Sequence, residues 1–347
     1  MPPVSKLDLV RRGVQEVVTE EGLRDLLERV PRPRAYVGYE PSGYVHIGSG
    51  VIIAEKIKDL VAAGCDFTFL LADWHAMINN KLGGDLDAIR SCAKYFEDAF
   101  RALGVPDSVG FAFADDLVSG SGYWANVVRV SKSASVARIK RALTIMGRKE
   151  EDAELDASML IYPAMQVSDI HVLDLDLALG GMDQRHAHML YRDLAPRLGW
   201  KQVVALHTPL LVGLKGSGRM DAIEAKMSKS KPETAILIHD SPEEVARKVE
   251  KAFCPPKETE DNFVTEAARL ILLPKGPLRV ERPAKFGGDV MYKDFAELSK
   301  AYGAGDLHPK DLKAAVSQGL ADLLAPVRAY FARRPENLET LRKILAA

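Results

Sequence analysis

Two short stretches of the sequence carry side chains suited to binding a nucleoside triphosphate. In the first, residues 45–49, His46 and Gly48 stand where an apolar run gives way to a long helical pattern. A helix N-terminus offers free N–H groups and the positive end of the helix dipole, which suit phosphate. His46 can donate a hydrogen bond to a phosphate oxygen, and Gly48 leaves room for a ribose or a flat ring. Taken alone, however, the pattern favours a histidine that only caps the helix.

The second stretch is a lysine-rich loop at residues 225–233, with the sequence AKMSKSKPE. Glycines precede the loop, and within it lysines alternate with Met and Ser: Gly213, Gly216, Gly218, Lys226, Met227, Ser228, Lys229, Ser230 and Lys231. Lysines and hydroxyl groups on a glycine-flanked loop can fold over a triphosphate and neutralise a leaving pyrophosphate. The alternative is a solvated surface loop.

A third stretch, GGMDQR at residues 180–185, follows an apolar strand pattern. Gly180 and Gly181 allow a close approach to the backbone. Asp183 can accept hydrogen bonds from ribose hydroxyls, as carboxylates do in dinucleotide sites, or it can cap a helix. His75 also follows a strand, where it either lines a ligand pocket or packs in the core.

The elements that must position these residues alternate along the chain. Apolar runs predict strands at residues 35–39, 67–72, 110–115, 175–181 and 203–207. Helical spacing predicts helices at residues 8–30, 46–63 and 87–103, and an all-helical segment over residues 122–170. Strands that alternate with helices indicate a parallel sheet with right-handed crossovers, in which ligands bind at the carboxyl ends of the strands.

After about residue 240 the pattern is helical. Ser241 and Glu244 form a capping box, and an apolar stripe follows at Leu312, Val316, Leu320 and Leu323. The predicted fold is therefore α/β: a Rossmann-like catalytic domain over residues 1–238 and an α-helical domain over residues 239–347. The first domain contains a helical insertion at about 116–160 and the lysine loop at about 213–233.

Composition narrows the class of protein. The chain has 347 residues, 47% of them hydrophobic, which is enough for a large core and two domains. Its formal net charge of -1 excludes a polycation that binds nucleic acid by charge alone. Three cysteines without metal-site spacing favour a reduced, cytoplasmic compartment, and no apolar run approaches the length of a membrane span.

The two phosphate-binding stretches together resemble the paired signatures of the class I aminoacyl-tRNA synthetases. Lys226–Ser230 matches the lysine signature in full, and His46 and Gly48 match the first and third positions of the His-Ile-Gly-His signature. Ser49 stands at its fourth position, and it can donate a hydrogen bond but carries no positive charge. The resemblance covers nearly the whole chain and is closest to the archaeal and eukaryal tyrosyl-tRNA synthetases, on YVGYEPSG, LLADWHA, IYPAMQVSDIH, GGMDQR, FGGD and HPKDLK.

This resemblance implies that the chain joins tyrosine to tRNA(Tyr) at the expense of ATP, with Mg²⁺ accompanying the ATP and no metal site of its own. It assigns catalysis to His46, Lys226 and Lys229, and ATP binding to Gly48, Ser49, Asp183, Met227, Ser228 and Ser230. It assigns tyrosine binding to Tyr36, Gly38, Glu40, His75, Tyr162, Gln166, Asp169 and Gln184. It also implies a homodimer.

A phenol pocket needs hydrogen-bonding groups at its far end. By resemblance, Tyr36 and Asp169 bracket the tyrosine hydroxyl. Tyr162, Gln166 and Asp169 follow one another at spacings of four and three, which places them on one helical face. Without the resemblance, Tyr36 is equally well a core tyrosine and Asp169 a carboxylate on a helix surface.

Two groups of residues point to RNA. The segment 129–149 contains seven basic residues and no acid, so Arg138, Lys140 and Arg141 are predicted to contact tRNA phosphates. By resemblance, Phe286, His308 and Asp311 contact the anticodon, where an aromatic ring stacks on a base and a carboxylate accepts from guanine. The alternatives are that the basic residues form a solvated face, that Phe286 packs in a turn, and that Asp311 is an acidic residue in the first turn of a helix.

Two other functions remain open at this point. A tryptophanyl-tRNA synthetase would share the fold and differ in the pocket. A non-catalytic synthetase-like tRNA-binding protein is the other, and the serine at position 49 is the feature that favours it.

Overall fold

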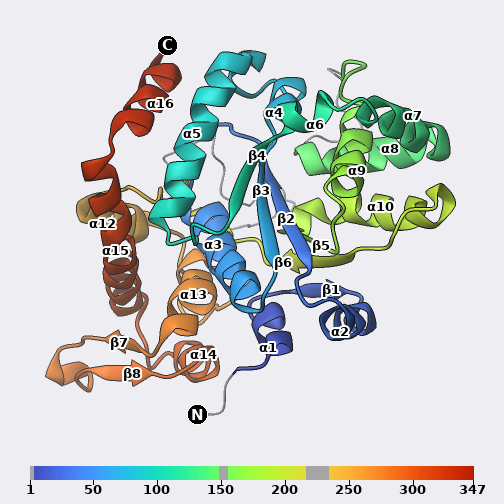
Figure 1. Ribbon diagram of the computed structural model, residues 1–347. Helices are drawn as coiled ribbons and strands as arrows, with labels where there is room; N and C mark the ends of the chain where they lie inside the picture. The colour runs from blue at the N-terminus through green and yellow to red at the C-terminus, as the bar shows by residue number, and fades with distance from the viewer. Residues whose placement is uncertain (1–3, 148–154, 216–233) are drawn as a thin grey trace. The chain divides into compact units, whose positions relative to one another are not determined.

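The computed structural model describes residues 4–147, 155–215 and 234–347 (Figure 1). By their internal contacts these residues form two compact units. The first unit contains Met1–Gly43, Glu55–Pro209 and Asn337–Ala347, and the second contains Tyr44–Ala54 and Leu210–Glu336. These units are defined by contacts alone, and the predicted domain boundary at residue 238 stays a prediction.

The first unit is built on a six-stranded sheet with the order β1-β6-β5-β2-β3-β4. The strands from β6 to β4 run parallel to one another, and β1 pairs antiparallel with β6. The strand bounds are β1 Glu16–Val18, β2 Arg34–Tyr39, β3 Asp66–Leu71, β4 Gly110–Phe113, β5 Leu177–Gly181 and β6 Val204–Thr208. The predicted parallel α/β sheet and its five predicted strands are confirmed.

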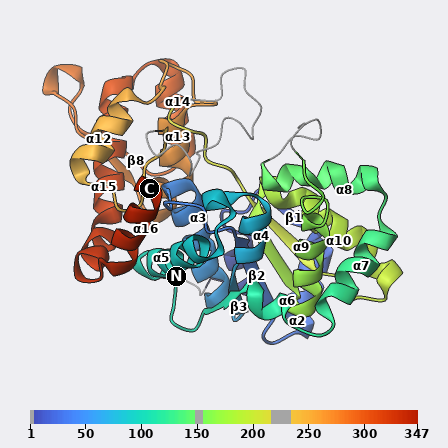
Figure 2. The ribbon, with the colours of Figure 1, turned by 90° about the horizontal axis from the view of Figure 1, so that it is seen from above.

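Helices cover both faces of this sheet, with α5 and the second half of α3 on one face and α9 and α10 on the other (Figure 2). Their ends follow local signals: Asp85 caps α5, and Gly64 and Gly104, at φ 97° and 84°, follow α3 and α5. The bounds are α3 Ile47–Ala62, α4 Asp73–Ile78, α5 Leu86–Ala102, α9 Tyr162–Val172 and α10 Arg185–Leu198, with 3₁₀ turns η1 Lys81–Gly84 and η3 Met182–Gln184.

Between β4 and β5 the described residues form helices joined by turns, with no strand among them, as the predicted helical segment requires. It contains α6 Ala114–Val118, α7 Tyr123–Ser133, α8 Val136–Ala142 and the 3₁₀ turn η2 Leu143–Met146 before α9. Tyr123, Val127 and Val130 lie on the buried face of α7, four and three residues apart.

The prediction of one helix over residues 8–30 is wrong. Two helices, α1 Lys6–Arg11 and α2 Glu20–Arg29, flank the strand β1. Gly13 adopts φ 67°, which ends the first helical run, and Thr19 caps the second by accepting a hydrogen bond from Gly22 N. The valines near residue 17 fit a helical stripe and a strand equally well, and pairing with β6 decides for the strand.

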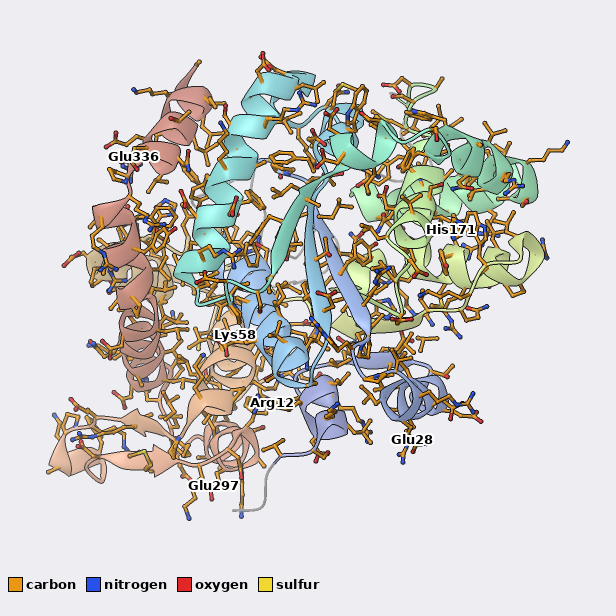
Figure 3. All side chains as sticks on the ribbon, in the orientation of Figure 1. Arg12, Glu28, Lys58, His171, Glu297 and Glu336 are labelled. Atoms are coloured by element: carbon orange, nitrogen blue, oxygen red, sulfur yellow. The ribbon has the colours of Figure 1, made fainter. Side chains whose placement is uncertain are left out.

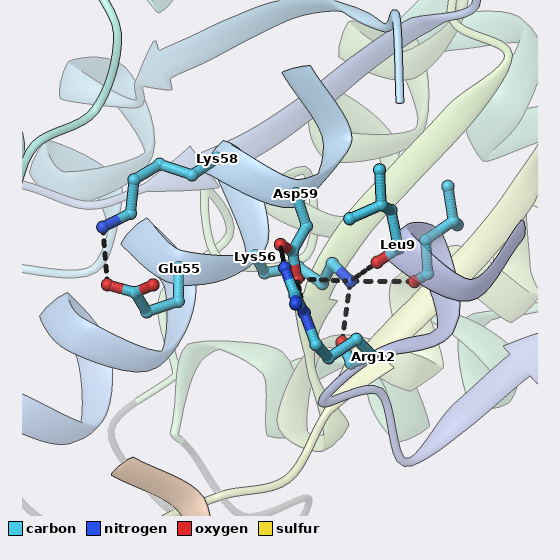
Figure 4. Close-up of polar contacts among 7 residues, drawn as sticks. Leu9, Arg12, Glu55, Lys56, Lys58 and Asp59 are labelled. Atoms are coloured by element: carbon cyan, nitrogen blue, oxygen red, sulfur yellow. Dashed lines mark hydrogen bonds and ion pairs between the residues drawn. The ribbon is translucent and has the colours of Figure 1, made fainter. Parts of the chain in front are cut away.

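A buried lysine fastens the end of α1 to α3. Lys56 Nζ donates to the carbonyl oxygens of Leu9, Val10 and Arg12 at 2.7, 2.9 and 2.7 Å (Figure 4). Burial lowers the pKa of Lys56 to about 8, although the nearby Asp59 carboxylate opposes the shift. Arg12, labelled in Figure 3, pairs with the same carboxylate. Lys56 thus satisfies carbonyl groups that a helix end leaves without partners.

The second unit is mainly helical. Its bounds are α12 Pro242–Lys251, α13 Phe263–Ala267, the π-helical turn η5 Ala268–Leu272, the 3₁₀ turns η6 Leu273–Lys275 and η7 Ala284–Phe286, α14 Phe295–Ala304 and α15 Pro309–Arg333. The predicted capping box of Ser241 and Glu244 is confirmed. On α15, Leu324 rather than Leu323 completes the fully buried stripe.

One feature departs from the helical pattern predicted after about residue 240. Strands β7 Leu278–Val280 and β8 Val290–Tyr292 form an antiparallel pair, which is too short to show a clear alternation in the sequence. The last helix, α16 Glu336–Ala346, belongs mostly to the first unit, where Asn337 Nδ2 donates to Asp98 Oδ2 at 2.7 Å.

Candidate active site

His46 caps the helix α3. Its Nδ1 accepts a hydrogen bond from Ser49 N at 3.2 Å, and Ser49 Oγ donates to His46 O at 3.3 Å. The predicted alternative of a helix cap is therefore part of what this side chain does. Because Nδ1 is the acceptor, a neutral ring carries its proton on Nε2, which becomes the donor atom that phosphate requires. Capping and phosphate binding are compatible at this residue.

A side chain at Gly48 would be crowded at the start of α3. A Cβ at this position would lie 3.2 Å from Leu211 Cβ and 3.3 Å from His46 Nδ1. The sequence predicted that the glycine makes room for a nucleotide. The close neighbours that the structure gives it are Leu211 and the His46 ring, and the prediction of a nucleotide contact remains untested.

The segment that follows the lysine loop pairs with the backbone beside His46. Ile47 N donates to Ile236 O at 2.9 Å, and Ile238 N donates to Val45 O at 3.1 Å. The two signature stretches are thus joined through the residues directly after the second one. The loop residues themselves, Lys226, Met227, Ser228, Lys229 and Ser230, lie outside the described residues.

Within the first unit, Asp169 on α9 is a buried carboxylate with partners from two other helices. Tyr123 Oη, on α7, donates to Asp169 Oδ1 at 2.7 Å. His75 Nε2, on α4, lies 3.1 Å from Asp169 Oδ2, but no aligned hydrogen bond reaches either nitrogen of this ring from the described residues. Burial lowers the pKa of His75, and the neighbouring carboxylates, Asp169 above all and then Glu40 and Asp73, more than offset this and raise it.

The charge of the same carboxylate affects the pKa of Tyr36 on β2. Burial raises the pKa of Tyr36 well above its usual value, and the charge of Asp169 raises it further, while a hydrogen bond with Gln166 opposes both effects. Tyr36 is therefore a neutral phenol at physiological pH. Tyr36, Gln166 and Asp169 belong to one set of interacting groups, as the resemblance implies.

A second carboxylate, Glu40, binds the other end of the same helix. Tyr162 Oη donates to Glu40 Oε1 at 2.6 Å, and Asn79 Nδ2 donates to both carboxylate oxygens at 3.0 and 3.1 Å. The Tyr162 ring also meets the His75 ring edge to face, with centroids 4.9 Å apart. Gly38 is an exposed position of β2.

Gln184 connects the GGMDQR turn to this cluster. Gln166 Nε2 donates to Gln184 Oε1 at 3.2 Å, and Gln184 Nε2 donates to Ile145 O at 3.2 Å. Gly180 makes this possible, because a Cβ there would lie 2.7 Å from Gln184 Cβ. The close approach predicted at this glycine is made by a side chain of the same turn.

Asp183 is partly exposed on η3, and its charge contributes, after burial, to the raised pKa of Tyr39. The first turn of α10 has no capping side-chain hydrogen bond at its N-cap Gln184. Both the alternative of Asp183 as a helix cap and its predicted contact with ribose stay predictions.

Sequence reasoning missed Tyr123 and Asn79. Tyr123 reads as one more apolar position of an amphipathic helix, and only its hydroxyl, at a fully buried position, signals a polar partner. Asn79 is 2% exposed and so needs partners for its amide, which Glu40 and Met146 O supply.

The basic residues predicted to meet tRNA lie on α8. Arg138 is bound to Asp193 on α10 at 2.7 Å, Lys140 is half-buried, and Arg141 is exposed. One of these three cations thus already has a carboxylate partner, which lowers its value for a phosphate contact.

The three residues predicted to meet the anticodon lie in the second unit. Phe286 is 61% exposed, with Lys285 Nζ 5.0 Å from the ring centroid. His308 caps α15 through its ring, which accepts from Lys310 N, and Asp311 lies in the first turn. The exposed ring of Phe286 leaves its face open to a partner, and the predicted anticodon contact stays a prediction.

Arg282 ties these residues together. Its Nε donates to Gly288 O and its Nη1 to Asp306 O, both at 2.9 Å. One contact fixes the turn that follows Phe286, and the other fixes the segment that precedes His308. The guanidinium thereby holds the two parts of the predicted anticodon surface to each other.

In the part of the chain that the structure describes, none of the helices combines the length and the apolar character needed to traverse a lipid bilayer.

Comparison with known proteins places the chain in a family. Residues 29–325 match the family described as tRNA synthetases class I (W and Y). The tyrosine–tRNA ligase of Aeropyrum pernix is 50% identical over 98% of this chain and 96% of its own length. That of Saccharolobus solfataricus is 48% identical over 98% of this chain and 96% of its own length.

Solved structures agree with the sequence matches. The crystal structure of tyrosyl-tRNA synthetase from Aeropyrum pernix has a TM-score of 0.88 at 46% identity, over 99% of this chain and 98% of the other. That from Pyrococcus horikoshii, complexed with L-tyrosine, has a TM-score of 0.92 at 40% identity, over 97% and 98%. With a family match over most of its length and relatives of this similarity from end to end, the chain belongs to the tyrosyl-tRNA synthetases of class I.

Proposed function

We propose that the cluster around Asp169 in the first unit is the tyrosine site of an ATP-dependent tyrosine–tRNA ligase. The ligase activity itself follows from the family. The observation that carries the site assignment is a carboxylate 1% exposed, beside a buried neutral phenol at Tyr36. Burial of such groups is costly unless they are hydrogen-bonded, so they favour a ligand with a hydroxyl group over phenylalanine.

The remaining pocket residues suit the other end of an amino acid. Tyr162, Gln166 and Gln184 offer hydroxyl and amide groups that can accept from an α-ammonium group, and Glu40 supplies a negative charge beside Tyr162. We assign His75 to the wall of the same pocket and Gly38 to its backbone. The Pyrococcus horikoshii structure, which contains L-tyrosine, supports an amino-acid site in this fold.

The reaction has two steps. The tyrosine carboxylate attacks the α-phosphorus of ATP to give tyrosyl-adenylate and pyrophosphate. The terminal ribose hydroxyl of tRNA then attacks the adenylate carbonyl, which gives tyrosyl-tRNA and releases AMP. The substrate carboxylate is itself the nucleophile, so the protein contributes positioning and charge stabilisation. We assign phosphate contacts to His46 Nε2, Gly48, Ser49 and the loop residues Lys226, Met227, Ser228, Lys229 and Ser230, and ribose contact to Asp183.

Two finer points concern partners of the reaction. Mg²⁺ would be bound chiefly through the ATP phosphates, because this ion retains waters and is usually held by phosphates with one or two carboxylates. tRNA would meet the protein at Arg138, Lys140 and Arg141 near its acceptor end and at Phe286, His308 and Asp311 near the anticodon. The catalytic domain would extend to residue 238, with the anticodon-binding domain after it.

The assembly and its place in the cell are also part of the proposal. The resemblance implies a homodimer, and α7 carries two exposed apolar side chains four residues apart, Trp124 at 44% and Val128 at 66% exposure, which a two-fold contact would bury. Analytical ultracentrifugation of the full chain tests this assembly. A role in charging tRNA for translation supports a cytoplasmic location, and the absence of disulfides at the three cysteines is compatible with a reducing compartment.

ATP–pyrophosphate exchange is the deciding experiment. Exchange that depends on tyrosine, and not on tryptophan, followed by transfer of tyrosine to tRNA(Tyr), is the expected result. Absence of exchange with bound tyrosine would instead favour the non-catalytic tRNA-binding protein, in which Ser49 fails to replace a histidine. Exchange that responds to tryptophan alone would contradict the pocket assignment.

A further inference from the structure

The two oxygens of the Asp169 carboxylate have different surroundings. Oδ1 accepts the short hydrogen bond from Tyr123 Oη at 2.7 Å, whereas the described residues give Oδ2 only the unaligned ring of His75 at 3.1 Å. A carboxylate accepts about four hydrogen bonds in all. One oxygen is thus firmly held by the protein, and the other retains capacity for a donor from outside.

The hydroxyl of Tyr123 is more than packing requires. The ring lies with Val127 and Val130 on the buried face of α7, 1% exposed, where a phenylalanine would fill the same space. The hydroxyl group lies 3.3 Å from Met165 O and 2.7 Å from Asp169 Oδ1. A hydroxyl has one proton, and the charged and nearer acceptor takes it.

The donor role of Tyr123 does not change with pH in the working range. Burial raises the pKa of Tyr123 far above its usual value, and the charge of Asp169 and the hydrogen bond to it raise it further. Tyr123 is therefore always a neutral donor to Oδ1. The phenols of Tyr123 and Tyr36 thus lie next to one carboxylate, and the Tyr123 hydroxyl donates its hydrogen bond to it.

We propose that Tyr123 is a positioning residue for amino-acid selection, which holds Asp169 through Oδ1 so that Oδ2 faces the hydroxyl of the bound tyrosine. This inference rests on the proposed tyrosine site. It adds a specificity determinant, on a different helix, that does not contact the substrate itself. His75 lies against the other carboxylate oxygen, Oδ2, of Asp169.

Loss of the Tyr123 hydroxyl releases Oδ1. The carboxylate is then free to rotate toward His75, whose pKa its charge already raises, and away from the substrate hydroxyl. Tyrosine loses a well-placed acceptor. Phenylalanine loses nothing, because it never formed that hydrogen bond. The effect therefore falls on the ratio between the two amino acids, which a general loss of stability would leave unchanged.

The test is Tyr123→Phe in the full chain, with kcat and KM for tyrosine and for phenylalanine in ATP–pyrophosphate exchange. We expect the ratio of the two kcat/KM values to fall about 10- to 100-fold, the consequence of one weakened hydrogen bond to a charged group. The loss should appear mainly as a higher KM for tyrosine. An unchanged ratio, or an equal loss for both amino acids, would overturn the proposal.

Tyr191→Phe is the matched control. Tyr191 is also fully buried in the first unit, and its hydroxyl donates to a backbone carbonyl, Lys201 O, at 2.9 Å. The same atom is removed, with no carboxylate involved. This variant should shift the melting temperature about as much as Tyr123→Phe and keep the wild-type ratio. A similar fall in the ratio with Tyr191→Phe would also overturn the proposal.

A second comparison uses Asp169→Ala, which removes the buried charge together with both acceptor oxygens. In this background Tyr123→Phe should change the ratio by less than twofold, because the group it positions has gone. A further fall as large as in the wild type would mean that Tyr123 acts without Asp169.

Equilibrium binding of tyrosine and of phenylalanine separates this inference from the proposed function. If the wild-type chain binds tyrosine but shows no exchange, the proposed ligase reaction fails, and the binding ratio of Tyr123→Phe still decides the role of Tyr123. If the wild type binds tyrosine no better than phenylalanine, the pocket assignment and this inference fall together.

Discussion

At the scale of single residues, Gly180 shows how closely this site is packed. Its missing side chain is replaced by that of Gln184, whose Cβ would lie 2.7 Å from a Cβ at position 180, with His188 Cε1 at 3.1 Å. Contacts below 3 Å do not occur without displacement, and a Cβ cannot swing aside as the end of a long side chain does. Gln184 would have to leave its hydrogen bond with Gln166.

Gly180→Ala is therefore expected to raise the KM for tyrosine and to lower the unfolding free energy by about 1–3 kcal/mol, as overpacking does. Steady-state exchange kinetics and urea denaturation measure the two effects. Gly110→Ala is the control, because a Cβ on that strand glycine meets nothing within 4 Å. If both substitutions have the same small effect, the crowding at Gly180 is not real.

At the scale of elements, the short strand β1 contributes Glu16 to a series of hydrogen-bonded polar side chains at the sheet. Glu16 Oε2 accepts from His207 Nδ1 at 2.8 Å, and Arg185, next to Gln184, binds the same carboxylate. With its proton on Nδ1, a neutral His207 accepts at Nε2 from His188 Nδ1, 3.0 Å away. Burial and the neighbouring His207 lower the pKa of His188 to about 3.

This lowered pKa predicts a loss of stability in acid. In the unfolded chain His188 takes up its proton near pH 6.5, but the folded chain resists protonation until about pH 3, so stability is lost as pH falls between these values. At pH 4.5 the cost is about 2–3 kcal/mol. His188→Asn, whose amide can replace Nδ1–H, should flatten the dependence of unfolding free energy on pH between 6.5 and 4.5.

His186→Asn is the control for that experiment, since His186 is exposed on the same helix and its ring is hydrogen-bonded to Thr144 Oγ1 at 2.8 Å. It should keep the wild-type slope. An identical slope in His188→Asn and the wild type would show that His188 is accessible to protons in the folded chain.

The attachment of α1 gives a second prediction at this scale. Lys56→Met should lower the unfolding free energy by about 2–4 kcal/mol, because three carbonyl groups and Asp59 lose a buried partner. Chemical denaturation measures the change. Lys58→Met, on the same helix but only partly buried against Glu55, should cost less than 1 kcal/mol, as surface ion pairs do. Equal costs would mean that Lys56 is not a structural cap.

At the scale of the whole molecule, two kinds of assay distinguish residues proposed to act on tyrosine from residues proposed to act on tRNA. The proposed tyrosine site lies in the first unit, and the residues proposed to read the anticodon lie in the second. Pyrophosphate exchange reports on amino-acid activation without tRNA. Aminoacylation reports on both steps and on tRNA. A residue that acts only on tRNA must therefore change the second assay and leave the first unchanged.

Asp311→Ala is expected to leave tyrosine-dependent exchange near normal and to lower aminoacylation efficiency by about 1–3 kcal/mol in effective transition-state binding, the value of one good base contact. The loss should shrink on a tRNA whose first anticodon base has been changed, and a double-mutant cycle measures that coupling. Asp322→Ala, on the same helix and bound to Gln318, is the control. If the losses from the Asp311 substitution and from the base change were strictly additive, Asp311 would not contact that base and would act only as an acidic residue at the start of the helix.

Local signals in the sequence determined much of this protein. The five parallel strands, the capping box at Ser241 and the glycines that follow α3 and α5 all depend on neighbours a few residues away. The placement of Tyr162, Gln166 and Asp169 on one helix follows from the helical repeat alone. The signature stretches identify the family, because the types and order of their residues can be recognised in the sequence without knowledge of the fold.

Only the tertiary structure decided which distant groups meet. Tyr123 and Asp169 are 46 positions apart, Glu40 and Tyr162 are 122 apart, and Glu16 and His207 are 191 apart. Periodicity fixes the face on which a side chain lies but not which other element packs there. β1 was missed for the same reason, since its three residues become a strand only by pairing with β6, and Lys56 reads as a surface lysine until α1 packs over it.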